Sequence, residues 1–303
     1  MTILQLRYII ATIETGSITE AAKRLHVSQP SLSSAIKDVE AEIGEEIFIR
    51  SRSGVQLTKR GKEFAGYARA VITQMQLLEN RFVNEKQGQI VFGVSTQHYT
   101  FAENAFVELT KKFEGGKYDF YFNETGTHRI LEDVSNRLSN IGVIYLSDEN
   151  EDSLRKVMDE YDLAFTQLFE AKLHLLVRRE HPLAQETKVS LEDLKEYPRI
   201  NFVQGSYEAP YYAEEMFSTL PSDKEIRIND RGAIVRLLLG SDAYTISSGI
   251  FPRYLHGSEI ISVPLDSERT MRIGYVIVRG HVLSELEQMY IDEIMKYAPE
   301  SAG

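Results

Sequence analysis

Hydrophobic residues near the start of the chain recur every three or four positions, in short runs that are separated by turn signals. The first run has the spacing of one face of an amphipathic helix: Leu6, Ile9, Ile10 and Ile13. Gly16 ends this run, and a second helix is predicted behind Ser17 or Thr19 as its cap, continuing to Leu25. Residues 26–28 then predict a turn, so the pattern indicates two short helices that lead into a third.

The third helix is predicted to begin behind Ser28, with Pro30 in its first turn, where the missing N–H costs no hydrogen bond. Its apolar residues are four, three and four positions apart and predict one buried stripe: Leu32, Ile36, Val39 and Ile43. The tip and outer face then carry short or polar side chains: Gln29, Pro30, Ser31, Ser33, Ser34 and Lys37. Such a helix suits entry into a DNA major groove, although a solvated amphipathic helix explains this segment equally well by itself.

A β-hairpin and a long helix are predicted next. Strand-like runs at residues 46–50 and 55–57 flank a turn that contains Arg52, which resembles the wing of a winged helix-turn-helix. From Thr58 to about Glu85, apolar residues follow a heptad: Phe64, Ala68, Val71, Met75, Leu78 and Phe82. We expect this helix to pair with a second copy, and packing on its own chain is the alternative. Residues 84–89 are typical of a hinge.

Beyond residue 89 the pattern alternates between strands and helices. Strands are predicted at residues 90–94, 118–123, 141–146, 199–202, 225–228 and 243–247. Amphipathic helical segments are predicted at residues 102–113, 130–138, 211–220 and 233–239. This alternation of strands and helices indicates an α/β architecture. Turn-rich breaks at residues 178–184 and 263–266 could be the boundaries between two lobes.

The distribution of charge supports this division of the chain. The net charge of −11 is unusual for a DNA-binding protein, but residues 1–69 hold 10 Lys and Arg against 8 Asp and Glu, or +2. The remainder holds 24 against 37, or −13, so contact with DNA falls to the N-terminal part. The absence of cysteine excludes disulfides and thiol chemistry. With neither a long apolar stretch nor a signal peptide in the pattern, we expect a cytoplasmic protein without membrane contact.

Taken together, the N-terminal residues resemble the LysR-type transcriptional regulators. The resemblance rests on Gly16-Ser17-Ile18-Thr19, Ala21-Ala22, Leu25, Ser28 to Ser33, Ile36, Val39-Glu40, Ile43-Gly44, Ile47-Phe48, Arg50, Leu57-Thr58 and Gly61. Further along it is looser and includes residues 178–184 and 247–252, while Asn140 stands where the family often has an acidic residue.

The resemblance implies a multidomain α/β protein with an N-terminal winged helix-turn-helix, a long linker helix and a two-lobed effector domain like periplasmic binding proteins. The implied domains are residues 1–58, 59–88 and 89–303. Within the last, lobe one would comprise approximately residues 89–163 and 267–303, and lobe two approximately residues 164–266.

Two sets of candidate site residues follow. For DNA, we expect Gln29, Ser31 and Ser33 to read bases beside Ser28 and Pro30, and these to contact phosphates: Ser17, Thr19, Lys37, Arg50 and Arg52. A ligand between two α/β lobes meets strand ends and helix N-termini. The candidates there are Ser95, Thr96, Gln97, Thr125, Gly126, Thr127, Asn201, Phe202, Gln204 and Ser248. Helix capping is the alternative role for the Ser and Thr residues, while His98 and His128 are expected to be internally satisfied or solvated.

The sequence therefore predicts a transcriptional regulator that binds a double-stranded DNA operator as a homodimer or homotetramer and responds to a polar or carboxylated inducer. RNA polymerase is a further candidate partner, and neither a cofactor nor a metal is expected. A two-lobed binding protein or an enzyme is the alternative, but no Ser/His/Asp arrangement or phosphate-binding glycine loop is recognisable. An architectural DNA-bending protein would be expected to be basic throughout.

Overall fold

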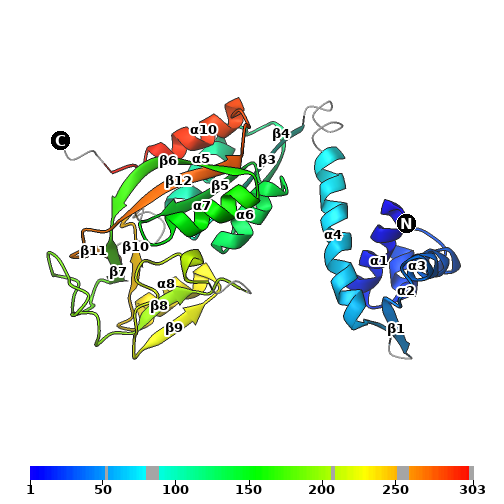
Figure 1. Cartoon of the computed structure of the whole chain (residues 1–303), viewed down its shortest axis with the longest axis horizontal. Helices are drawn as coiled ribbons and strands as arrows, with labels where there is room; N and C mark the ends of the chain where they lie inside the picture. Colours follow the sequence, from blue (N-terminus) through cyan, green and yellow to red (C-terminus); the bar gives the residue numbers. More distant parts are fainter. Residues whose placement is uncertain (52–53, 80–88, 206–208, 251–258, 300–303) are drawn as a thin grey trace. The chain divides into compact units, whose positions relative to one another are not determined.

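The computed structural model describes residues 1–51, 54–79, 89–205, 209–250 and 259–299, and the chain divides into two compact units, Met1–Gln87 and Gly88–Gly303 (Figure 1). The predicted contact Arg52 and the predicted seam residue Phe82 lie outside the described residues. Each unit has its own hydrophobic core.

The first unit begins with three helices, as predicted: α1 (Ile3–Thr15), α2 (Ile18–Arg24) and α3 (Gln29–Ile43). Side-chain caps fix where they begin, because the hydroxyl groups of Ser17 and Ser28 accept hydrogen bonds from backbone N–H groups of α2 and α3. Leu32, Ile36 and Val39 are fully buried, which confirms most of the predicted stripe. Ile43 is 37% exposed, so its predicted burial was wrong: it is the last residue of α3, beyond the helices that cover the stripe.

The hairpin is confirmed as the antiparallel strands β1 (Phe48–Ser51) and β2 (Gly54–Leu57). The helix α4 (Lys59–Glu79) follows directly and packs against α1. Along the predicted heptad, Ala68 is buried and Phe64 packs on the helical core, whereas Val71 and Leu78 are 44% and 53% exposed. The first part of the heptad seam therefore packs on its own chain, and the later part, with Val71 and Leu78, is exposed to solvent.

The second unit begins with a five-stranded sheet in the order β4-β3-β5-β12-β6 (Figure 1). Its strands are β3 (Gln89–Thr96), β4 (Lys117–Glu124), β5 (Ile141–Leu146), β6 (Leu163–Lys172) and β12 (Thr270–Val278). The strands β3, β4 and β5 are parallel, and β12 runs antiparallel between β5 and β6. Helices α5 (Thr100–Lys111) and α10 (Glu285–Met295) pack together on one face, and α6 (Thr127–Ser135) and α7 (Glu151–Glu160) cover the other.

In the part of the second lobe that the structure describes, there are two smaller sheets and one α-helix. Its elements are β7 (His174–Arg178), β8 (Arg199–Phe202), β9 (Glu225–Ile228), α8 (Arg231–Gly240), β10 (Thr245–Ser247) and β11 (Ile260–Pro264). The sheet orders are β10-β7-β11 and β8-β9. The expected lobe boundary, at approximately residue 164, falls inside β6, which pairs with β12 of lobe one. The expected break at residues 263–266 likewise begins inside β11.

The helix predicted at residues 211–220 is absent from this described segment, which holds only the short 3-10 helix η3 (Pro210–Tyr212) followed by turns. Four consecutive residues, 214–217, are buried there. A surface helix cannot bury four successive side chains on one stripe, so burial on several sides overrides the amphipathic pattern. This irregular connection brings Glu214 and Glu215 to the boundary between the two lobes.

Candidate functional site

The tip of α3 is the candidate DNA-reading surface in the first unit. Gln29, Pro30, Ser31 and Lys37 are exposed there, while Ser33 is only partly exposed. The Ser28 hydroxyl accepts the Ser31 N–H at 3.2 Å, and the two hydroxyl groups lie 2.6 Å apart. Ser28 is therefore a helix cap at the same tip that presents the candidate base-reading side chains.

The hairpin is anchored to the turn between α1 and α2. The Val55 N–H donates to the Gly16 carbonyl at 3.0 Å, and a Cβ added to Gly54 would lie 2.6 Å from that same oxygen. Ser17 caps α2 beside this contact, and Thr19 is exposed. Arg50 is described through its backbone, which pairs with Val55. The predicted phosphate-binding residues thus come from the α1–α2 turn, from α3 and from the hairpin, all within one unit.

Two of the candidate ligand contacts after β3 are internal to lobe one. Ser95 is fully buried, donates to Asp133 Oδ2 at 2.8 Å and lies 2.8 Å from the Ser139 hydroxyl. Thr96 is also fully buried and donates to the carbonyl of Gln97 at 2.9 Å. Their hydroxyl groups hold the loops around β3 and do not reach the boundary between the lobes.

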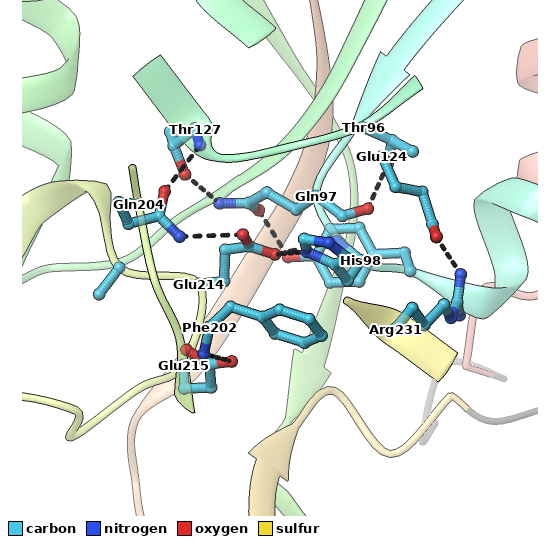
Figure 2. A network of polar contacts seen from close by, with 12 residues as sticks. Thr96, Gln97, His98, Glu124, Thr127, Phe202, Gln204, Glu214, Glu215 and Arg231 are labelled. Atoms are coloured by element: carbon cyan, nitrogen blue, oxygen red, sulfur yellow. Dashed lines mark hydrogen bonds and ion pairs between the residues drawn. The ribbon is translucent and has the colours of Figure 1, made fainter. Parts of the chain in front are cut away.

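Gln97 and Thr127 are part of a chain of hydrogen bonds that crosses between the lobes (Figure 2). Gln97 Nε2 donates to the Thr127 hydroxyl at 2.6 Å, and that hydroxyl donates to the Tyr212 carbonyl of lobe two at 2.8 Å. The Thr127 N–H donates to Gln204 Oε1 at 2.9 Å. A Cβ on Gly126 would lie 2.8 Å from this Gln204 oxygen, so glycine permits the close approach.

A buried ion pair between His98 and Glu214 is the second link between the lobes (Figure 2). Glu214 Oε2 lies 2.7 Å from His98 Nδ1 and accepts the His98 backbone N–H at 2.9 Å, while Oε1 accepts from Gln204 Nε2 at 2.9 Å. The His98 ring stacks on Phe202 at 3.7 Å between centroids. Burial lowers the pKa of His98, but the Glu214 carboxylate outweighs it, so the pKa stands above its ordinary value.

Arg231 makes a third link, from the start of α8 to lobe one. Its guanidinium group contacts the Glu124 carboxylate and the Thr100 hydroxyl, and lies 3.2 Å from Glu103. Burial raises the pKa of Glu124, and Arg231 opposes that shift. The boundary between the lobes therefore contains basic side chains, His98 and Arg231, next to acidic ones, Glu124 and Glu214.

These links border a hollow of about 440 Å³, called here the interlobe hollow, which is within the size range of small-molecule sites. It is lined by His98, Glu124, Thr125, Gly126, Arg129, Glu132, Val203, Gln204, Gly205 and Asn229. Beyond His98 and Phe202 lies a smaller, mainly apolar cavity of about 60 Å³. The two spaces share His98 in their linings, and a mixture of apolar surface with a few polar groups is typical of sites for small organic ligands.

Some predicted ligand residues lie apart from the hollow and others were missed. Asn201 donates to Glu225 at 2.8 Å, and Ser248 is buried, with its hydroxyl accepting the Ile250 N–H at 3.4 Å. The missed residues are His98, Glu124, Glu214, Glu215 and Arg231. Two of them gave a signal: Glu124 directly follows the strand predicted at residues 118–123, and His98 lies two residues after the end of β3.

Among the described residues, no group of three or more His, Cys, Asp or Glu side chains could hold a metal ion. No described helix is long and apolar enough to span a membrane.

A winged helix-turn-helix joined to a two-lobed unit with a hollow between its lobes defines a DNA-binding regulator with a ligand-binding domain. Residues 3–62 match the bacterial regulatory helix-turn-helix proteins of the lysR family, and residues 84–298 match the LysR substrate binding domain. The chain therefore belongs to the LysR family of transcriptional regulators.

Relatives of known sequence and solved structures are consistent with membership of this family. The chain is 29% identical over 216 residues to the uncharacterized regulator YvbU of Bacillus subtilis, covering 70% of this chain and 69% of YvbU. It is 25% identical over 304 residues to the transcriptional activator CmpR of Synechocystis, covering 98% and 95% of the two chains. The fold resembles that of CbnR, a LysR family transcriptional regulator, with a TM-score of 0.64 at 17% identity, covering 99% of this chain and 100% of CbnR.

Proposed function

We propose that this regulator binds its operator through α3 and the hairpin, and that a small polar or carboxylated ligand in the interlobe hollow modulates its activity. The main observation in support is that the His98–Glu214 and Thr127–Gln204 contacts join the lobes at the rim of this hollow. A ligand that replaces these contacts changes the spacing of the lobes, and its differential affinity for the two spacings shifts their equilibrium.

The polar lining supports a polar ligand. The start of α6 borders the hollow through Thr125 and Gly126, and a helix N-terminus favours a carboxylate. Arg129 also lines the hollow. This regulatory role accounts for the site without catalysis. As a regulator of transcription, the protein would act in the cytoplasm beside the DNA and RNA polymerase.

Footprinting of the full chain on the DNA upstream of its own coding region, with and without candidate metabolites, tests the proposal. We expect a protected region whose extent changes with at least one metabolite. A footprint that no metabolite alters would contradict ligand control, and the absence of sequence-specific protection would contradict operator binding itself.

Base reading is assigned to the exposed tip of α3. Because a good amide contact to a base edge is worth about 1–3 kcal/mol of discrimination, Gln29→Ala is expected to reduce the preference for operator over random DNA about tenfold. The measurement is competitive binding at fixed salt. Lys23→Ala on α2, which removes a charge paired with Glu20, is the control and should leave the preference unchanged.

Dimerisation through α4 would place two such tips on one operator. Val71 and Leu78 are seven residues apart and both are exposed, as expected for an unpartnered helix seam. CbnR, which has a similar fold, has been solved in complex with its target DNA. Light scattering of Val71→Glu/Leu78→Glu is expected to show a smaller oligomer than the wild-type dimer or tetramer, and an unchanged mass would contradict this role of α4.

A further inference from the structure

A second hollow, of about 180 Å³, lies between the lobes and has no role in the proposed function. Lobe one contributes the end of β5 and the start of α7, and lobe two contributes the irregular connection after β8. The lining residues are Tyr145, Ser147, Glu149, Asn150, Pro210, Tyr211, Ala213, Glu215, Phe217, Ser218 and Thr219. We call this space the Glu215 hollow.

Three polar atoms on residues of this lining make no hydrogen bond of normal geometry among the described residues: Ser147 Oγ, Asn150 Nδ2 and Glu215 Oε2; Asn150 is nevertheless close enough to the Tyr145 hydroxyl to act on its pKa. Their residues are buried, with exposed fractions of 2%, 4% and 6%. A buried polar atom without a partner is costly, so three such atoms on residues that line one space indicate that something polar completes them. Water alone could do so, but the hollow has room for more than one molecule of that size.

The chemistry of the lining indicates which group fits. Glu215 offers an uncommitted carboxyl oxygen, because Oε1 already accepts the Phe202 N–H at 3.1 Å. The other acid, Glu149, is paired with Arg269. The lining also contains the rings of Tyr145, Tyr211 and Phe217, of which Phe217 already has the Arg269 guanidinium group 4.9 Å from its centroid. A carboxylate in a site with aromatic rings is a typical environment for an ammonium group. On the lobe-one side, Asn150 and Ser147 offer hydrogen-bond donors.

We propose that the Glu215 hollow binds a small organic ammonium compound that also carries a hydrogen-bond acceptor. The ammonium group is held by Glu215 among the rings of Tyr145 and Tyr211. The acceptor takes hydrogen bonds from Asn150 Nδ2 and Ser147 Oγ. Because the ligand contacts both lobes, it stabilises their closed arrangement.

Binding of the ammonium ligand is coupled to the release of a proton from Glu215. Burial raises the pKa of Glu215 well above its ordinary range, and the neighbouring Glu214 raises it further, while Arg199 opposes the shift. The other titratable groups of the lining are Glu149, Tyr145 and Tyr211, and burial also raises the pKa of Tyr145. An arriving ammonium group favours the carboxylate form of Glu215, so a proton leaves the protein as the ligand binds.

Calorimetric titration of the full chain tests this with three probes of similar size: ethanolamine, ethylene glycol and glycolate. We expect ethanolamine to bind with a dissociation constant of about 1–10 mM, within the ceiling for so small a ligand. Its binding enthalpy should depend on the ionisation enthalpy of the buffer, because a proton is released. The other two probes should bind at least about tenfold more weakly, since neither brings a positive charge to Glu215.

Two variants locate the site. Glu215→Gln keeps the acceptor for the Phe202 N–H and should weaken ethanolamine binding about tenfold and remove the buffer dependence. Asn150→Asp keeps the oxygen that accepts the Ser147 N–H and should also weaken binding, because the amide donor is lost. Glu132→Gln, which alters the lining of the interlobe hollow, is the control and should bind ethanolamine as the wild type does.

The proposal is overturned if ethanolamine does not bind at about 100 mM, if ethylene glycol or glycolate binds equally well, or if Glu215→Gln leaves binding unchanged. These outcomes are separate from the test of ligand control, because the titration requires no DNA and the control variant changes the other hollow.

Discussion

Glu214→Gln is the substitution that most directly tests the link between the lobes. Glu214 accepts three hydrogen bonds, from the His98 backbone N–H, the His98 ring and Gln204. A glutamine in its place sets an NH2 group against a donor whichever way its amide is turned. The variant also removes the negative charge from a pair whose side chains are only 10% and 5% exposed.

The size of the expected destabilisation follows from the burial of this pair. A buried donor left without an acceptor costs about 1–3 kcal/mol, and removing one partner of a buried ion pair costs about 3–5 kcal/mol. Because glutamine keeps one acceptor atom, we expect the free energy of unfolding to fall by about 2–4 kcal/mol near pH 6. For a unit of this size, that corresponds to a fall of about 4–16 °C in Tm.

The effect should depend on pH through His98. Its pKa is raised in the folded protein, so the stabilisation by the ion pair is fully present below the ordinary value of about 6.5. It is lost as the pH rises through the raised value. The difference in Tm between wild type and Glu214→Gln should therefore be largest near pH 6 and should shrink toward alkaline pH.

Scanning calorimetry of the full chain across this pH range is the assay, with the transition of the Gly88–Gly303 unit as the readout. Glu108→Gln is the matched control, because Glu108 is 43% exposed and pairs with Lys111 at the surface, where the pair contributes about 0–1 kcal/mol. A fall in Tm below about 1 °C at pH 6, or a difference that grows with pH, would refute the reasoning.

Three further predictions concern the N-terminal unit. Leu32→Ala removes a fully buried side chain and should lower the free energy of unfolding by about 2–5 kcal/mol in urea denaturation; a loss below about 1 kcal/mol would contradict its place in the core. Gly61→Ala places a Cβ 2.1 Å from the Ile47 carbonyl oxygen and should cost about 1–3 kcal/mol, whereas Gly66→Ala, with open space around it on α4, should stabilise by up to about 1 kcal/mol. Equal effects of the two substitutions would be inconsistent with this contact. Lys37→Ala should weaken DNA binding across all sequences and reduce the salt slope of the binding constant by about one, and an unchanged slope would argue against a phosphate contact.

The N-terminal unit was largely predictable because its signals are local. The caps Ser17 and Ser28 and the spacing of Leu32, Ile36 and Val39 fix the helices from residues that are near one another in the chain. The open part of the heptad is different. Arg7 of α1 pairs with Glu79 at the end of α4, yet Val71 and Leu78 stay exposed, so their exposure depends on which side of α4 the rest of the unit covers, and no local spacing reveals that.

The candidate ligand site was only partly predictable, because strand ends indicate where a site lies and not which side chains turn toward it. Thr125, Gly126 and Gln204 do line the interlobe hollow. Ser95 does not, because Asp133, which lies 38 positions further along the chain, takes its hydroxyl group into the core of lobe one.

The sequence by itself determined the family, the helices of the DNA-binding unit and most of the strands, since periodicity and capping act over a few residues. Only the tertiary structure decided the contacts between the lobes. His98 and Glu214 are 116 positions apart, and Glu214 lies in a segment whose pattern predicts a helix. Burial on several sides at the boundary between the lobes outweighs that local preference, and it brings the charged groups of the site together.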